Sequence, residues 1–311
     1  MIKHILRILV SGVFVVYIVL NVDWPIIYET FQKIDIPYYL LSTGLAIFAS
    51  LFLALKYHLF IKDSPLAMSI PKLLKINFIS RFYALFLPSA LGPEAIRWYK
   101  ITQNKQGRSF FLACTMAERL IFLLILLLFG SLPLFFYPEN TEIIALRHQI
   151  LPLLIVAYIL IGLGLIYFAF AGMQNLIKKI IIKIPGIRKI QKLNQFIRNF
   201  SIKQPLLPLL VPLVCLSLLW QLVFLLRLFF LFLSLDLPLT FMDVAWMASL
   251  VMLLQALPIS FAGIGVREGS YAYLLTLFNL PSEKGVLIGI LFFTQMLILA
   301  AIGGLFNLLE T

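Results

Sequence analysis

Charged side chains interrupt several otherwise apolar stretches of this 311-residue chain, and these are the residues whose types could carry chemistry. Glu118 and Arg119 lie about nine residues into the apolar segment 109–136, which at 1.5 Å per residue places them ~13 Å from its start. Two further arginines interrupt apolar segments in the same way: Arg81 and Arg227. A charge at membrane depth costs at least ~2.5–3.5 kcal/mol, so each must face a partner or a wet cavity.

Two interpretations of these charges stay open. One is function, because intramembrane charge marks substrate and ion pathways by default. The other is a structural ion pair such as Glu118–Arg227. Neighbouring residues on a helix point about 100° apart, so Glu118 and Arg119 cannot both face one partner.

A first short motif, Gly92-Pro93-Glu94-Ala95-Ile96-Arg97, has the form of a helix start. Proline suits the first helical position, and an acidic residue suits the first turn. Glu94 and Arg97 are three residues apart and are predicted to share a face of that helix.

A second motif runs from Pro258 to Glu268 and contains Gly263, Gly265 and Arg267. Its glycines allow a backbone to approach a ligand closely, and a helix is predicted to begin near Arg267. Free N–H groups at a helix start, together with an arginine, suit a phosphate. Glu268 would orient Arg267 or receive a cationic head group; ordinary capping and turn glycines are the alternative for both motifs.

Other chemistries find no support in the residue pattern. The phosphate-binding loop, the H-E-x-x-H zinc motif and C-x-x-C are absent, and the three histidines are scattered, so we expect neither a metal site nor a cofactor. Cys114 and Cys215 lie in apolar runs as core residues. The net charge of +12 is better explained by cytoplasmic loops than by nucleic-acid binding.

The elements that must position these residues are transmembrane helices. Hydrophobic residues make up 62% of the chain and charged residues 12%, about half of what a soluble protein carries. Six windows are long and apolar enough to cross a bilayer: 5–20, 38–60, 109–136, 150–171, 206–233 and 286–308. The first is predicted to be a retained helix rather than a cleaved signal peptide. Two segments, 76–91 and 244–280, are apolar but broken by proline and glycine.

Loop charge predicts the orientation. The loop 172–204 carries eight basic residues and no acidic one, so it is placed in the cytoplasm, with the acidic loops 21–37 and 137–149 outside and both termini inside. The segment 76–91 has basic residues on both flanks, Lys56 among them, which favours a re-entrant segment over a full span. The segment 244–280 would be its counterpart from the outside.

The predicted fold is therefore an all-α polytopic membrane protein with six full spans and two broken or re-entrant segments, about eight helices. Two broken segments in corresponding halves indicate inverted repeats around a transport-type site. We expect a single transmembrane domain over 1–311, with a first half at 1–171, the basic loop 172–204, and a second half at 205–311.

At these motifs the chain resembles the lysylphosphatidylglycerol synthase transmembrane region, also called the flippase-like domain family. The resemblance rests on 92–99, on Glu118-Arg119-Leu120 and on the motif ending at Glu268, and it extends over almost the whole chain. It implies translocation of a phospholipid, such as an aminoacylated phosphatidylglycerol, or of an isoprenoid-linked lipid. No aminoacyl-transferase domain follows the last span before Thr311, which departs from the two-domain synthases.

The favoured function is movement of a lipid between leaflets of the plasma membrane through a polar cavity, without ATP. The predicted lining consists of Glu94, Arg97, Glu118, Arg119, Arg227, Gly263, Gly265, Arg267 and Glu268. A membrane lipid is the expected partner. One alternative is a membrane-embedded lipid transferase with Glu94 or Glu118 as base. Another is a non-catalytic partner of a separate synthase or glycosyltransferase.

Overall fold

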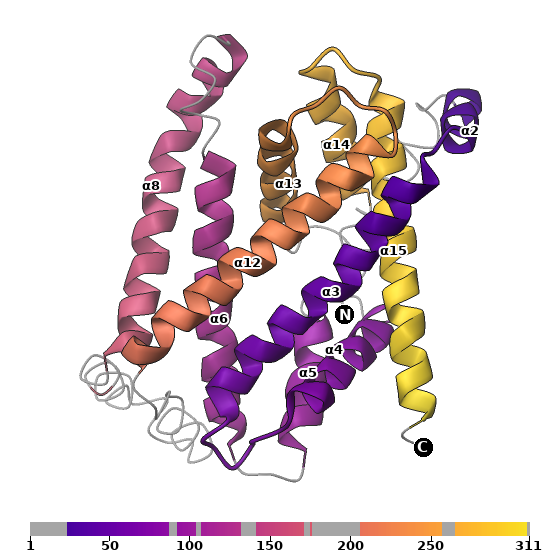
Figure 1. Ribbon diagram of the computed structural model, residues 1–311. Coiled ribbons are helices and arrows are strands. Elements are labelled where there is room, and N and C mark those ends of the chain that lie inside the picture. Colours follow the sequence, from indigo (N-terminus) through magenta and orange to yellow (C-terminus); the bar gives the residue numbers. More distant parts are fainter. Residues whose placement is uncertain are drawn as a thin grey trace, which may run out of the picture.

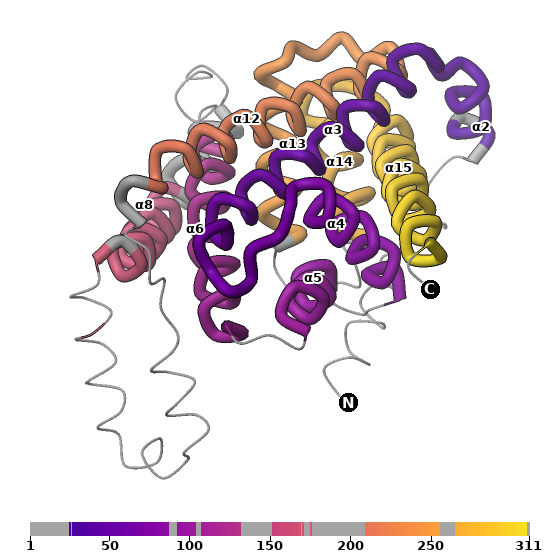
Figure 2. Tube along the Cα trace, turned by 60° about the horizontal axis from the view of Figure 1, so that its bottom comes forward, coloured from indigo at the N-terminus to yellow at the C-terminus, as the bar shows by residue number. Residues whose placement is uncertain are grey.

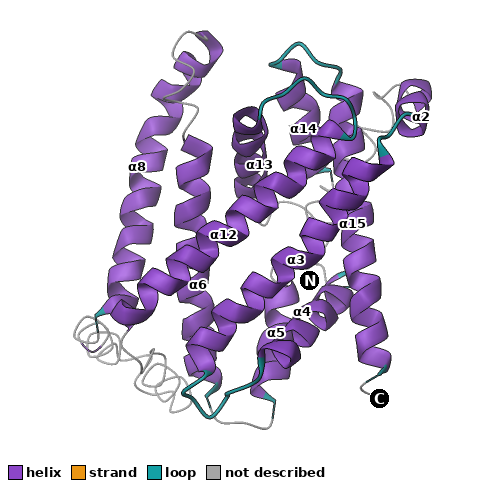
Figure 3. Cartoon of the chain, viewed as in Figure 1, coloured by secondary structure: helices purple, strands orange, loops and turns teal. Residues whose placement is uncertain are grey.

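The computed structural model describes residues 24–86, 92–103, 107–131, 141–170, 175, 206–256 and 265–309, and these form ten helices without a strand (Figures 1 and 3). This confirms the all-α prediction. The helices are α2 (Trp24–Gln32), α3 (Ile36–Ile61), α4 (Ile70–Ala84), α5 (Gly92–Thr102), α6 (Arg108–Ser131), α8 (Thr141–Ala169), α12 (Leu206–Leu233), α13 (Phe241–Ala256), α14 (Val266–Thr276) and α15 (Ser282–Leu308).

Five of these helices are long and apolar enough to cross a membrane: Ile36–Ile61, Arg108–Ser131, Leu151–Phe168, Leu209–Leu233 and Ser282–Leu308. They match five of the six predicted spans. The sixth, 5–20, lies outside the described residues, as does the basic loop 172–204 apart from residue 175.

Two predicted loops contain helix instead. The segment 21–37 contains α2, and α8 begins at Thr141 within the predicted loop 137–149. Both stretches are less hydrophobic than the spans beside them, so their hydropathy does not distinguish them from loops. The polar ends of helices extend past the hydrophobic window because backbone hydrogen bonding does not require apolar side chains.

The two broken segments form short helical pairs. α4 and α5 contain 15 and 11 residues, and α13 and α14 contain 16 and 11. At 1.5 Å per residue the longest is about 24 Å, too short for a hydrocarbon core of about 30 Å. α4 follows the end of α3 and α5 leads to the start of α6, so this pair lies at one end of the bundle. α13 and α14 lie at the opposite end (Figures 1 and 2).

The order of elements repeats with inverted orientation, as the sequence predicted. A long helix, a short pair and a second long helix occur once as α3–α6 and again as α12–α15. The helix contacts are related in the same way between the two repeats. α3 packs against α12, and α4 packs against α15 as α13 packs against α6 (Figure 1).

Each repeat has its own apolar core. Residues of α3–α6 form one cluster around Tyr57, Phe60 and Phe111, and residues of α12–α15 form another around Phe232 and Tyr271. Van der Waals packing of these side chains holds the helices of each repeat together. The charged residues lie on the helices that carry these cores.

Candidate functional site

Lys56 and Glu118 form an ion pair between α3 and α6. The Lys56 side chain is 2% exposed and that of Glu118 13%, and Lys56 Nζ also lies 5.6 Å from the ring centre of Trp220 on α12. Glu118 thus neutralises a cation that has almost no access to solvent. The alternative ion pair Glu118–Arg227 is wrong, because Lys56 is the partner of Glu118.

Arg119 forms a second ion pair, with Glu94 at the start of α5. Its Nη1 atom lies 3.3 Å from Glu94 Oε1, and both side chains are about a third exposed. Glu118 and Arg119 therefore face different helices, α3 and α5, which confirms the angular argument from the sequence. This pair holds the first turn of α5 against the middle of α6.

Arg97 lies one turn beyond Glu94 and points toward α3. Its Nη1 donates to Tyr57 Oη at 3.0 Å, and its guanidinium lies 5.1 Å from the Tyr57 ring centre. Arg97 is 4% exposed, and its Nε has no hydrogen-bond partner within the described part of the chain. A phenol is a neutral acceptor, so Tyr57 orients the guanidinium without cancelling its charge.

The second motif builds the start of α14. Gly265 has a φ of 83°, which suits glycine, and its N–H donates to Glu268 Oε2 at 2.7 Å. Arg267 Nε and Nη2 both donate to Glu268 Oε1, at 3.1 and 2.5 Å. Glu268 therefore caps the helix with one oxygen and holds Arg267 with the other. The helix starts predicted near Pro93 and Arg267 are both present, at Gly92 and Val266.

The Arg267–Glu268 pair lies against the middle of α15. The Arg267 guanidinium is 4.8 Å from the Phe292 ring centre, and its Nη1 is 3.6 Å from Met296 Sδ. A Cβ placed on Gly289 would lie 2.6 Å from Glu268 Cγ, so glycine is needed there for the close approach. Gly263 lies outside the described residues.

Arg227 on α12 has only neutral partners among the described residues. Its Nε donates to Gln295 Oε1 at 2.8 Å, and its guanidinium lies 4.3 Å from the Phe292 ring centre. Gln295 Nε2 donates in turn to the hydroxyls of Ser42 and Thr43 on α3. Arg227 is 6% exposed, and no described residue accepts a hydrogen bond from its Nη2.

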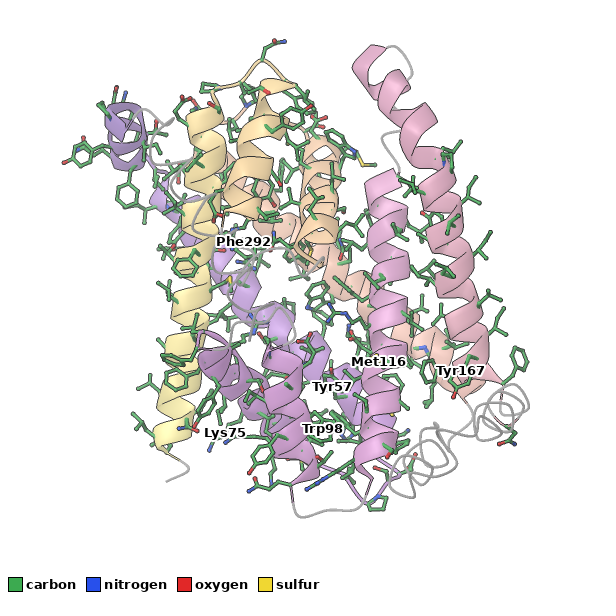
Figure 4. The ribbon with its side chains drawn as sticks, turned by 180° about the vertical axis from the view of Figure 1, so that it is seen from behind. Tyr57, Lys75, Trp98, Met116, Tyr167 and Phe292 are labelled. Atoms are coloured by element: carbon green, nitrogen blue, oxygen red, sulfur yellow. The ribbon has the colours of Figure 1, made fainter. Side chains whose placement is uncertain are left out.

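These groups form one electrostatic network through the centre of the bundle. Arg81 on α4 interacts electrostatically with Arg97 and with Glu94. Arg227 interacts electrostatically with Arg81 and Arg267. Figure 4 shows Phe292 near the middle of the molecule and Tyr57 on the other side of the same central region. The network therefore joins the two repeats.

Three arginines of this network have no carboxylate within ion-pair distance among the described residues: Arg81, Arg97 and Arg227. The three carboxylates, Glu94, Glu118 and Glu268, are each paired with another cation. A buried charge costs about 2.5–3.5 kcal/mol even on the most lenient scale. The excess of positive charge on these apolar helices therefore marks the three arginines as candidate functional residues.

Sequence reasoning missed several members of this network. Lys56 was assigned to a cytoplasmic flank, but it lies buried on α3. Its position inside the predicted span 38–60 was the signal that could have found it, as for Glu118. The roles of Tyr57, Gln295 and Phe292 had no such signal, because neutral and aromatic residues are ordinary in a transmembrane helix.

Metal chemistry finds no support in the part of the chain that the structure describes. No group of three or more His, Cys, Asp or Glu side chains is placed to hold a metal ion there. The His58 ring contacts the Met68 carbonyl oxygen at 2.9 Å, and Cys114 is a buried free thiol.

The inverted repeat, the short helical pairs and the buried charges define a polytopic integral membrane protein with a polar centre, a layout typical of transport-type folds. The chain matches the family described as "Lysylphosphatidylglycerol synthase TM region" over residues 4–304, so it belongs to that family of membrane proteins related to lipid modification. Neither a curated protein nor a solved structure matches the chain.

Proposed function

We propose that this protein moves a membrane lipid between leaflets, with the lipid head group passing along the central charged network. The observation that carries this proposal is the meeting of two oppositely directed helical pairs at buried arginines. Glu94 at the start of α5 contacts the middle of α6, and Arg267 at the start of α14 contacts the middle of α15. Both helix starts therefore lie level with the middle of a long apolar helix, α6 or α15.

Helix starts and arginines together favour an anionic head group. A helix N-terminus carries about half a positive charge, and its first N–H groups lack intrahelical partners. The unpartnered Nε of Arg97 and Nη2 of Arg227 add two further donors. A phosphate group, which every phospholipid carries, has the acceptors that these donors lack.

The experiment is leaflet exchange of fluorescent phosphatidylglycerol in proteoliposomes. Arg97→Gln should slow exchange at least tenfold, because it removes a buried charge while keeping a donor for Tyr57. Arg108→Gln is the matched control: it removes one positive charge from the exposed start of α6, outside the network, and should leave the rate unchanged. Equal rates for both variants and the native protein would contradict the proposal.

A membrane-embedded transferase is the second candidate, with Glu94 or Glu118 as base. The two carboxylates are ion-paired with Arg119 and Lys56, which suits charge neutralisation better than proton abstraction. Incubating the purified protein with lipid acceptors and activated donors tests this candidate directly. Formation of a modified lipid would favour the transferase over the translocator.

A further inference from the structure

The two repeats place a cation at corresponding positions, but the hydrogen-bond acceptor of that cation is charged in one repeat and neutral in the other. Lys56 lies in the last third of α3 and contacts the middle of α6 through Glu118. Arg227 lies in the last third of α12 and contacts the middle of α15 through Gln295. The first acceptor is a carboxylate, which cancels the charge of Lys56. The second is a neutral amide, and no carboxylate among the described residues forms an ion pair with Arg227.

Arg227 is one of three arginines without an ion-pair partner among the described residues. Arg81 and Arg97 belong to the same network and are likewise without a carboxylate partner among the described residues. Arg97 and Arg227 are more than nine-tenths buried, and each keeps one side-chain nitrogen that no described residue accepts a hydrogen bond from. Desolvated guanidinium groups with open N–H donors are binding groups for phosphate oxygens.

We infer that the head group recognised here carries at least two negative charges on phosphate, as in a lipid phosphomonoester or a lipid diphosphate. Arg81, Arg97 and Arg227, which have no ion-pair partner among the described residues, would be its binding groups. This inference rests on the proposed function and narrows its substrate class. A cationic aminoacyl ester would meet repulsion from the same charges, since like charges in a region of low dielectric repel strongly.

Binding to the purified full-length chain in detergent tests the substrate class. The probes are phosphatidic acid, phosphatidylglycerol and the lysyl ester of phosphatidylglycerol, all with the same acyl chains. A phosphomonoester is close to dianionic at pH 7.5. We expect phosphatidic acid to bind at least tenfold more tightly than phosphatidylglycerol, and the lysyl ester to bind most weakly. Binding of the lysyl ester as tight as that of phosphatidic acid would overturn the inference.

Gln295→Glu is the sharpest variant, because it gives the second repeat the carboxylate that the first repeat has. It keeps an acceptor for Arg227 Nε and changes little volume, and it should remove most of the tenfold preference for phosphatidic acid. Arg227→Gln should have the same effect by removing the cation. Should both variants fold and retain the native preference, Arg227 is not a binding group and the inference is wrong. If neither variant folds, the lipid series on the native protein still decides.

Two further experiments test the source of the phosphate and, independently of the substrate class, the proposed function. Inorganic pyrophosphate that competes with phosphatidic acid would support recognition of the phosphate itself, whereas lipid preference without competition would support a lipid-borne phosphate. Leaflet exchange is measured with the same three lipids. Charge-selective binding without exchange would contradict the proposed function and leave the substrate class standing. Exchange that is fastest for the lysyl ester would contradict the substrate class and leave the function standing.

Discussion

The buried pair Lys56–Glu118 is the interaction whose loss has the clearest expected effect on stability. Glu118→Gln keeps the shape of the side chain but leaves Lys56, at 2% exposure, without a counter-charge. The free energy of unfolding should fall by about 3–5 kcal/mol. Thermal unfolding in detergent measures this, with Glu29→Gln as control, because the Glu29–Lys33 pair is fully exposed.

The double variant Lys56→Met/Glu118→Gln separates stability from function. With both charges removed, most of the lost stability should return, because the cost lies in the unpaired lysine. Lipid exchange by this double variant then shows whether the pair is needed for function. A single Glu118→Gln variant with native stability would show that Lys56 is solvated.

Arg267 is a residue at which lysine is not an equivalent cation. Its Nε and Nη2 both bind Glu268, and its planar group lies over Phe292. A lysine ammonium cannot reproduce this fork or the stacking. Arg267→Lys should therefore slow lipid exchange on the order of tenfold, about 1.4 kcal/mol, at unchanged net charge. Exchange at the native rate would reduce this motif to a structural helix start.

At the scale of elements, α15 is the helix against which both short pairs are anchored. A Cβ on Gly303 would lie 2.0 Å from the backbone oxygen of Phe78 on α4, and one on Gly285 would lie 2.4 Å from the backbone nitrogen of Ala272 on α14. Backbone atoms cannot move aside as side chains do, so these two glycines set the spacing of α4 and α14 from α15.

Gly303→Ala should therefore destabilise the protein, by about 1–3 kcal/mol as for other overpacked sites. Gly162→Ala on α8 is the matched control, since a Cβ there meets nothing within 4 Å. Alanine has the higher helix propensity, by up to about 1 kcal/mol, so the control should be neutral or stabilising. The midpoint of thermal unfolding compares the two. If the two variants unfold alike, α4 is not held tightly against α15.

At the scale of the whole molecule, exposed charge separates the two ends of the bundle. The end formed by the last turn of α3, the starts of α4 and α6 and the last turn of α5 is mainly basic: Lys62, Lys72, Lys75, Lys100 and Arg108, with Asp63. The opposite end is mainly acidic: Glu29, Asp35, Asp236 and Glu283, with Lys33 and Lys284. By the positive-inside rule, this excess of Lys and Arg predicts that the first end faces the cytoplasm.

Single cysteines in a background without Cys114 and Cys215 test this orientation. Substitutions at Gln103 and Leu309 should react with an impermeant maleimide only from the cytoplasmic side. Substitutions at Lys33 and Thr276 should react from outside. All four positions are exposed in the structure. Reaction of Gln103 and Leu309 from opposite sides would rule out a re-entrant α4–α5 pair.

Much of the fold was determined by the sequence alone, because the bilayer reduces the choice of structure to apolar helices. Five predicted spans, the two broken segments and the helix starts at Gly92 and Val266 follow from hydrophobic length, proline and glycine. The charged residues at membrane depth could be found in the same way. The inverted layout was predicted from the order of segments, although the residues of the two halves differ.

Only the tertiary structure decided which charges meet. Lys56 rather than Arg227 is the partner of Glu118, and Arg227 binds the neutral Gln295. A helix sequence gives the face and depth of a side chain, but its partner depends on how the helices of the two repeats cross. The pairing leaves Arg81, Arg97 and Arg227 without carboxylates among the described residues. That excess of positive charge arises from helix packing and cannot be derived from the spacing of residues along the chain.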